Sequence, residues 1–281
     1  MNKKLILVTT ILTFSLLSAC QNPSESTSGS ENAHASHNQE NTDKSDEHHA
    51  GKEQLNATFS FDKGTAAAEE DTELTILVSG KDGAPVNEFD ENHEKLLHLI
   101  IVNHDLSFFN HIHPEFQGEG KFTVTTSFPA GGDYKLFADF IPAGGSSTTL
   151  SEWVKVDGTE AEHNAVMADA KLTKEVDGKI VDLNLSSMKA NEEVNLTFNI
   201  RDAKTNKGVD TLEQYLGAVG HVVILSDDAE QYLHVHPIDE KATGPEARFA
   251  TSFPHSGTYK IWGQFQHNGE VFTVPFVVDI K

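Results

Sequence analysis

Cysteine is nearly absent from this chain, because Cys20 is the only one among 281 residues. A lone cysteine excludes disulfide bonds within the chain, so the folded part must be stabilised by its hydrophobic cores. Methionine is scarce too, since only Met167 and Met188 occur beyond the first residue. The chain therefore has no sulfur-rich site of the kind that binds cuprous ions.

Hydrophobic runs of membrane-spanning length are also missing. The longest apolar run, residues 5–17, is shorter than the ~20 residues that a transmembrane helix needs. It follows two lysines and ends in Leu17-Ser18-Ala19-Cys20, which resembles the lipobox of bacterial lipoproteins. We expect residues 1–19 to be a signal peptide and Cys20 to carry a lipid anchor on the extracytoplasmic face of the cell membrane. Ordinary secretion with a free Cys20 thiol is the alternative.

Basic residues are outnumbered by acidic ones, 21 Lys and Arg against 43 Asp and Glu, which gives a formal net charge of −22. This charge argues against nucleic acids and anionic lipid headgroups as partners. Residues 20–52 are rich in Ser, Asn, Glu and His and poor in apolar side chains. This composition predicts a disordered tether between the anchor and the folded part. Its histidines could capture loosely held metal: His34, His37, His48 and His49.

The remainder of the chain contains an internal repeat. Residues 98–114 and 221–237 share three histidines and a proline at a constant offset of 123 residues. Further matches join residues 126–129 with 251–254 and residues 132–137 with 257–262. We therefore predict a duplicated domain, with copies at 53–158 and 165–281. The equivalent histidines are His98 and His221, His111 and His234, and His113 and His236.

Each copy has the pattern of β-strands. Apolar and polar residues alternate at 74–78, 122–125 and 134–140, and Gly-containing turn signals separate these runs. About seven short strands in about 105 residues, without a long helical period, predict an immunoglobulin-like β-sandwich. The predicted fold is therefore all-β, with two tandem sandwiches after the signal peptide and the tether. An acidic segment, residues 157–164, joins the copies, and its length leaves open whether they pack together.

The three histidines of a copy can meet in one place. Residues i and i+2 of a strand point to the same face, so His111 and His113 present two neighbouring imidazoles. The residues between His98 and His111 suit a turn with short strand ends. An antiparallel pairing of the two strands would then bring the third imidazole close. We predict the same for His221, His234 and His236 in the second copy.

Three neutral imidazoles are typical ligands of copper(II), zinc(II) or nickel(II). Copper(II) is favoured by intrinsic affinity, and zinc(II) is the second choice. Asp139, on the predicted strand 134–140, is a candidate fourth ligand or an acceptor that fixes a ring tautomer. The second copy has Gln264 at that position, so either Asp139 is not a ligand or the two sites differ.

Other interpretations of the histidines remain open. A histidine in an apolar strand can be a core residue whose ring is hydrogen-bonded to a backbone carbonyl, and the chain would then be an immunoglobulin-like adhesion or assembly module. A metal-dependent enzyme is a third hypothesis, because three histidines leave a position open for water. The chain shows no phosphate loop, no nucleophile elbow and no obvious general base. We therefore expect a protein that is not an enzyme.

The histidine motif resembles that of a known family. Residues 98–102 and 111–114, with Phe128-Pro129 and residues 132–140, are similar to YtkA-like domains of exported bacterial proteins. The resemblance covers about fifty residues of each copy. It implies an immunoglobulin-like sandwich and, for some members, copper handling, with a protein that delivers or receives the metal as a partner. It implies metal-binding roles for His98, His111 and His113 and, by the repeat, for the equivalent histidines.

Overall fold

The computed structural model describes residues 54–233 and 235–281. The predicted signal peptide, the lipidation site Cys20, the predicted tether and His234 lie outside the described residues. Within the described residues the secondary structure consists of strands, and no helix there is long and apolar enough to cross a membrane.

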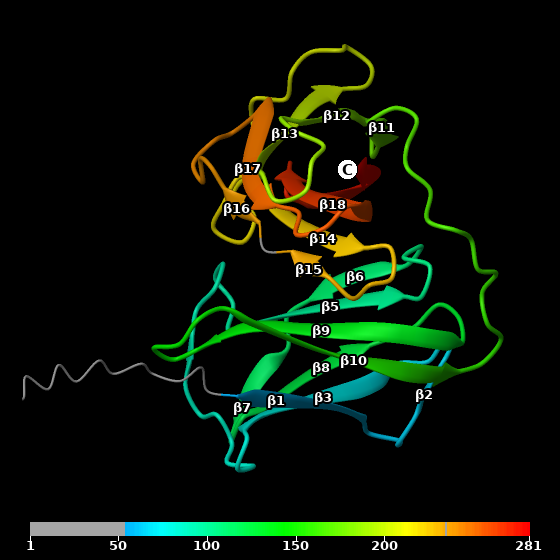
Figure 1. The fold of residues 1–281 in the computed structure, drawn as a ribbon, viewed down its shortest axis with the longest axis vertical. Coiled ribbons are helices and arrows are strands. Elements are labelled where there is room, and N and C mark those ends of the chain that lie inside the picture. Colours follow the sequence, from blue (N-terminus) through cyan, green and yellow to red (C-terminus); the bar gives the residue numbers. More distant parts are fainter. Residues whose placement is uncertain (1–53, 234) are drawn as a thin grey trace, which may run out of the picture. The chain divides into compact units, whose positions relative to one another are not determined.

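The first domain is a sandwich of two sheets (Figure 1). One sheet has the order β1-β3-β8-β7, formed by β1 (Leu55–Phe61), β3 (Thr72–Gly80), β8 (Lys121–Thr126) and β7 (Glu115–Gly118). The other has the order β2-β10-β9-β5-β6, and β4 (Phe89–Asp90) pairs with β9. Its strands are β2 (Ala66–Ala67), β10 (Thr148–Asp157), β9 (Gly132–Pro142), β5 (Leu97–Asn103) and β6 (Phe109–Ile112).

The second domain repeats this arrangement. One sheet has the order β11-β12-β13-β17-β16, formed by β11 (Thr173–Val176), β12 (Lys179–Leu185), β13 (Glu193–Asp202), β17 (Glu246–Ser252) and β16 (His236–Pro237). The facing sheet has the order β15-β14-β18-β19, formed by β15 (Tyr232–Leu233), β14 (His221–Ser226), β18 (Gly257–His267) and β19 (Glu270–Ile280).

The strand order of both domains is that of the immunoglobulin fold. Strands β1, β3, β8 and β7 correspond to strands A, B, E and D of that fold, and β5, β9 and β10 correspond to C, F and G. The second domain has the same correspondence through β12, β13, β17 and β16 and through β14, β18 and β19. The prediction of two tandem immunoglobulin-like sandwiches is confirmed.

A tyrosine corner fixes the same bend in each domain. The Tyr134 hydroxyl donates a hydrogen bond to the Ala130 carbonyl at 2.9 Å, and the Tyr259 hydroxyl donates one to the His255 carbonyl at 3.0 Å. Both tyrosines lie near the start of strand F, where this bond is a hallmark of the fold. The corner follows from the repeated Phe-Pro and Gly-x-Tyr motifs of the sequence.

Alternation along the strands explains the cores. On β3, Leu74, Ile76 and Val78 are buried, whereas the residues between them are more exposed. On β5 every residue is buried. Because successive side chains point to opposite faces, one face of β5 must lie in the core of its own sandwich and the other against something else.

The second domain covers that other face of β5. The two domains belong to one compact unit, and an apolar cluster separate from both sandwich cores joins them. Its eight buried members form four pairs of residues that are equivalent in the repeat. The two domains therefore meet through equivalent faces, with approximate two-fold symmetry. The pairs are Ile100 and Val223, Val102 and Leu225, Leu106 and Ala229, and Phe137 and Trp262.

Aromatic contacts follow the same symmetry. The Phe109 ring stacks on Trp262, with centroids 4.7 Å apart and an interplanar angle of 16°. The equivalent pair, Tyr232 and Phe137, has its centroids 5.6 Å apart. The domains thus pack together, a question that the sequence leaves open, and the interface is built mainly by β5, β6 and β9 against β14, β15 and β18.

Candidate metal centre

Three histidines of the first domain come together at this interface. His98 lies on β5, His111 on β6, and His113 directly after β6, which pairs antiparallel with β5. One ring nitrogen from each lies within 4.8 Å of the others. His98 is buried, and the other two are partly buried. The sequence-predicted convergence of these three imidazoles is present in the structure.

Two hydrogen bonds orient two of the rings. His98 Nε2 lies 2.8 Å from the Asn92 carbonyl oxygen, and His111 Nδ1 lies 2.6 Å from Gln264 Oε1. A carbonyl oxygen only accepts hydrogen bonds, so the nitrogen facing it carries the hydrogen. A neutral imidazole has one such hydrogen. His98 Nδ1 therefore carries a lone pair, and so does His111 Nε2 in the arrangement with the Gln264 amide oxygen toward the ring.

These two lone pairs face each other. His98 Nδ1 and His111 Nε2 are 3.0 Å apart, and without a cation or a proton between them the contact is repulsive. Two nitrogen ligands about 2.0 Å from one ion lie about 2.8 Å apart at a right angle and about 3.3 Å apart at the tetrahedral angle. The observed separation lies between these values, so the pair suits adjacent positions on a metal ion.

At neutral pH a proton does not occupy the space between these two nitrogens, because the imidazoles are unprotonated. Burial lowers the pKa of His98 to about 4 and that of His111 to about 3. Burial, and then the charge of Lys95, lowers the pKa of His113 to about 4. Three imidazoles thus converge in a largely buried place, and His113 Nε2 is left without a hydrogen-bond partner among the described residues.

The equivalent histidines of the second copy do not lie together as those of the first copy do. His221, on β14, lies against the first-domain group, with its ring centroid 5.3 Å from that of His98 and 4.8 Å from that of His111. His236 is an exposed residue of β16, and His234 lies outside the described residues. Among residues 54–233 and 235–281, the three first-domain histidines are the only group of ligand-type side chains this close together.

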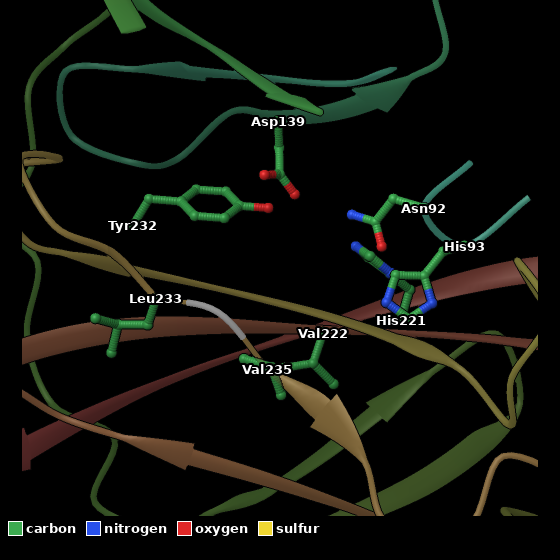
Figure 2. Close-up of a pocket in the computed structure, with 8 residues that line it drawn as sticks. All are labelled: Asn92, His93, Asp139, His221, Val222, Tyr232, Leu233 and Val235. Atoms are coloured by element: carbon green, nitrogen blue, oxygen red, sulfur yellow. The ribbon is translucent and has the colours of Figure 1, made fainter. Parts of the chain in front are cut away.

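Asp139 is buried on β9, directly across the strand pairing from His98. Its Oδ1 atom accepts hydrogen bonds from the Thr149 and Ser147 hydroxyls at 3.0 and 3.5 Å. Burial raises the pKa of its carboxyl group to about 6. Figure 2 shows the Tyr232 hydroxyl pointing toward this carboxylate. Asp139 is not part of the close three-histidine group, whereas its repeat equivalent, Gln264, orients His111.

The site also includes residues that the sequence analysis does not single out. His93, in the loop before β5, lies with its ring centroid 5.4 Å from that of His221, and both line a small cavity (Figure 2). Burial lowers the pKa of His93, and the charge of Glu240 acts in the opposite direction. Asn92 supplies the carbonyl that orients His98. Neither residue lies in a periodic segment, so spacing alone gives no signal for them.

A family model described as a domain of unknown function, DUF8832, matches the chain twice, over residues 52–158 and 174–281. The two matches cover the two sandwiches, so the repeat in the sequence is a duplication of this domain. No curated protein matches the sequence. The matching family is not named YtkA-like, and that resemblance stays a prediction.

Several solved structures are distantly similar. They include the Escherichia coli adhesin FdeC, at 14% identity over 81% of this chain and 66% of that chain, with a TM-score of 0.28. The bacterial integrin-binding protein invasin has 12% identity over 79% and 39%, with a TM-score of 0.24. Titin Ig tandem domains A164-A165 have 11% identity over 82% and 97%, with a TM-score of 0.21. The chain thus spans about two thirds of FdeC and less of invasin. TM-scores this low carry no further information, and the fold assignment rests on the strand order.

Proposed function

The chain belongs to the DUF8832 family through two copies of its domain, and since the function of that domain is unknown, we propose from the site itself that the protein binds a metal ion. The supporting observation is that His98 Nδ1 and His111 Nε2 lie 3.0 Å apart while the other nitrogen of each ring faces a carbonyl oxygen, of Asn92 and of Gln264. A divalent cation bound by both nitrogens removes the repulsion between them, and His113 supplies a third ligand.

The ligand chemistry favours copper(II), with zinc(II) as the second choice. All three ligands are imidazoles, and the described residues offer no cysteine to the site. Imidazole nitrogens suit both ions, and the intrinsic order of affinities places copper(II) above zinc(II). The proposed role is non-enzymatic: a chaperone, buffer or scavenger of metal that is tethered to the extracytoplasmic face of the membrane through lipid on Cys20. A protein that delivers or receives the metal is the implied partner.

Isothermal titration of the full chain with copper(II), and separately with zinc(II), tests this function. The four tail histidines, His34, His37, His48 and His49, are replaced by asparagine so that only the folded part binds tightly. We expect tight binding that is lost when His111 and His113 are both replaced by asparagine. The matched control is His255→Asn, at an exposed position outside the site, which should bind as the parent does. A parent that binds neither metal would rule the function out.

The second candidate is an immunoglobulin-like adhesion or assembly module whose histidines serve packing only. The observation in its favour is that His98 and His221 are buried in an interface between two immunoglobulin-like domains, as packing residues would be. This candidate predicts that the His111→Asn, His113→Asn double variant keeps partner binding and that the parent has no tight metal site. Titration and partner binding together therefore separate the two candidates.

A further inference from the structure

The approximate two-fold symmetry of the domain interface extends to the histidines of the metal centre. Residues that are equivalent in the repeat face each other where such an interface crosses its axis, as they do in a symmetric dimer. His98 and His221 are equivalent, and their rings are stacked, with centroids 5.3 Å apart and an interplanar angle of 12°. The two copies therefore bring their first histidines to one place instead of two.

His221 has a ring nitrogen without a partner in this place. Its side chain is only 9% exposed, and Nε2 has no hydrogen-bond partner in the described part of the chain. Buried polar atoms without partners are rare in folded proteins and call for an explanation, such as a bound ion. The His221 ring centroid is 4.8 Å from that of His111, so this ring lies against the three-histidine group, although none of its nitrogens is close enough to all three to be counted in that group.

The second domain contributes a further group to the site. Gln264 Oε1 accepts the hydrogen bond from His111 Nδ1 at 2.6 Å, and Gln264 Nε2 donates to the Thr273 hydroxyl at 3.1 Å. Both residues lie in the second domain, whereas His111 lies in the first. The orientation of a first-domain ligand thus depends on the domains being in contact.

We propose that the protein has one metal centre shared by both domains, in which His221 joins His98, His111 and His113 as a ligand. This inference rests on the proposed function and adds to it that metal binding holds the domains together. Four imidazole nitrogens form a ligand set that copper(II) and zinc(II) both accept. The centre replaces the two separate sites that the sequence repeat predicts.

A shared centre couples metal binding to domain contact. The ion binds fully only when the domains are docked, so metal binding strengthens docking by the same factor by which docking strengthens metal binding. A weakened contact lowers the apparent metal affinity in proportion to the fraction of molecules in which the domains remain docked. Trp262 offers a test of this coupling, because it lies in the apolar interface and stacks on Phe109 without supplying a ligand.

The test is zinc(II) binding to the full chain with the four tail histidines replaced by asparagine, compared with three variants in that background. We expect one tight equivalent for the parent. His221→Asn should lower the affinity at least tenfold, since even residues that only orient a ligand contribute about 10–100-fold. Trp262→Ala should lower it as well, whereas His255→Asn, an exposed control, should leave it unchanged. Circular dichroism without metal checks that each variant is folded.

X-ray absorption at the zinc edge of the parent protein gives a result that needs no variant. Four imidazole ligands are expected, and three would overturn the shared centre. Two tight equivalents, or an affinity that His221→Asn and Trp262→Ala both leave unchanged, would also overturn it while the proposed function stands. A parent that binds no zinc or copper would refute the proposed function instead.

Discussion

Replacing Asp139 by asparagine should stabilise the metal-free protein at neutral pH and leave its stability at pH 4 unchanged. The carboxylate is 3% exposed and accepts hydrogen bonds from two hydroxyl groups, of Thr149 and Ser147, while no cation is paired with it among the described residues. Burial of the charged form is the dominant effect, and it raises the pKa from the ordinary value of 3.8 to about 6. Asparagine keeps the shape of the side chain and removes the charge.

The size of the effect follows from this pKa. A raised pKa means that the folded state holds the proton more tightly than the unfolded chain does. The resulting destabilisation is absent below pH 4, grows between pH 4 and 6, and is complete above pH 6. A difference of about 2 pKa units corresponds to about 3 kcal/mol, at 1.36 kcal/mol per unit. We therefore expect Asp139→Asn to gain up to about 3 kcal/mol at pH 7.

Urea denaturation at pH 4 and pH 7, in the presence of a chelator, measures both values. The control is Asp133→Asn on the same strand, at an exposed position, which should have little effect at either pH. An Asp139→Asn variant that is less stable than the parent at pH 7 would contradict this prediction, because it would show that the carboxylate has a favourable partner. A large loss of metal affinity in this variant would instead support the role of Asp139 as a ligand.

Three further predictions concern the site and the fold. Gln264→Leu removes the acceptor for His111 Nδ1, so it should destabilise the protein by about 1–3 kcal/mol and weaken metal binding about 10–100-fold, as measured by denaturation and titration. The pKa values of His98, His111 and His113 are depressed in the folded protein, so between pH 6.5 and 4 the unfolded chain binds more protons than the folded one. The free energy of unfolding of the Asp139→Asn variant should therefore fall as the pH drops from 6.5 to 4, and a flat profile would contradict this. Tyr134→Phe removes the corner hydrogen bond and should cost about 0.5–1.5 kcal/mol in the same assay, with unchanged metal affinity.

The architecture of each domain could be predicted from local patterns. Alternation such as that of residues 74–78 specifies a strand with one buried face, and the Tyr134 motif specifies the corner between strands E and F. The convergence of His98 with His111 and His113 also follows from local geometry, since it needs only the i, i+2 rule and one antiparallel pairing. These features depend on residues that are close in the sequence.

The shared character of the site could not be predicted in this way. It depends on the contact between two domains whose equivalent residues are 123 positions apart, and no periodicity specifies that contact. One signal was available: residues 99–102 and 222–225 are apolar at every position, which indicates strands buried on both faces. His93 has no comparable signal in the sequence, because it lies in an irregular loop and not in a strand with periodic side chains; its φ is 48°.

The most direct test of a metal centre in this protein is anomalous X-ray diffraction from crystals of the full chain grown with zinc(II) or copper(II). We expect a peak within about 2.0–2.1 Å of both His98 Nδ1 and His111 Nε2. An ion located only elsewhere, with a metal-free His98–His111 pair still in contact, would contradict this expectation.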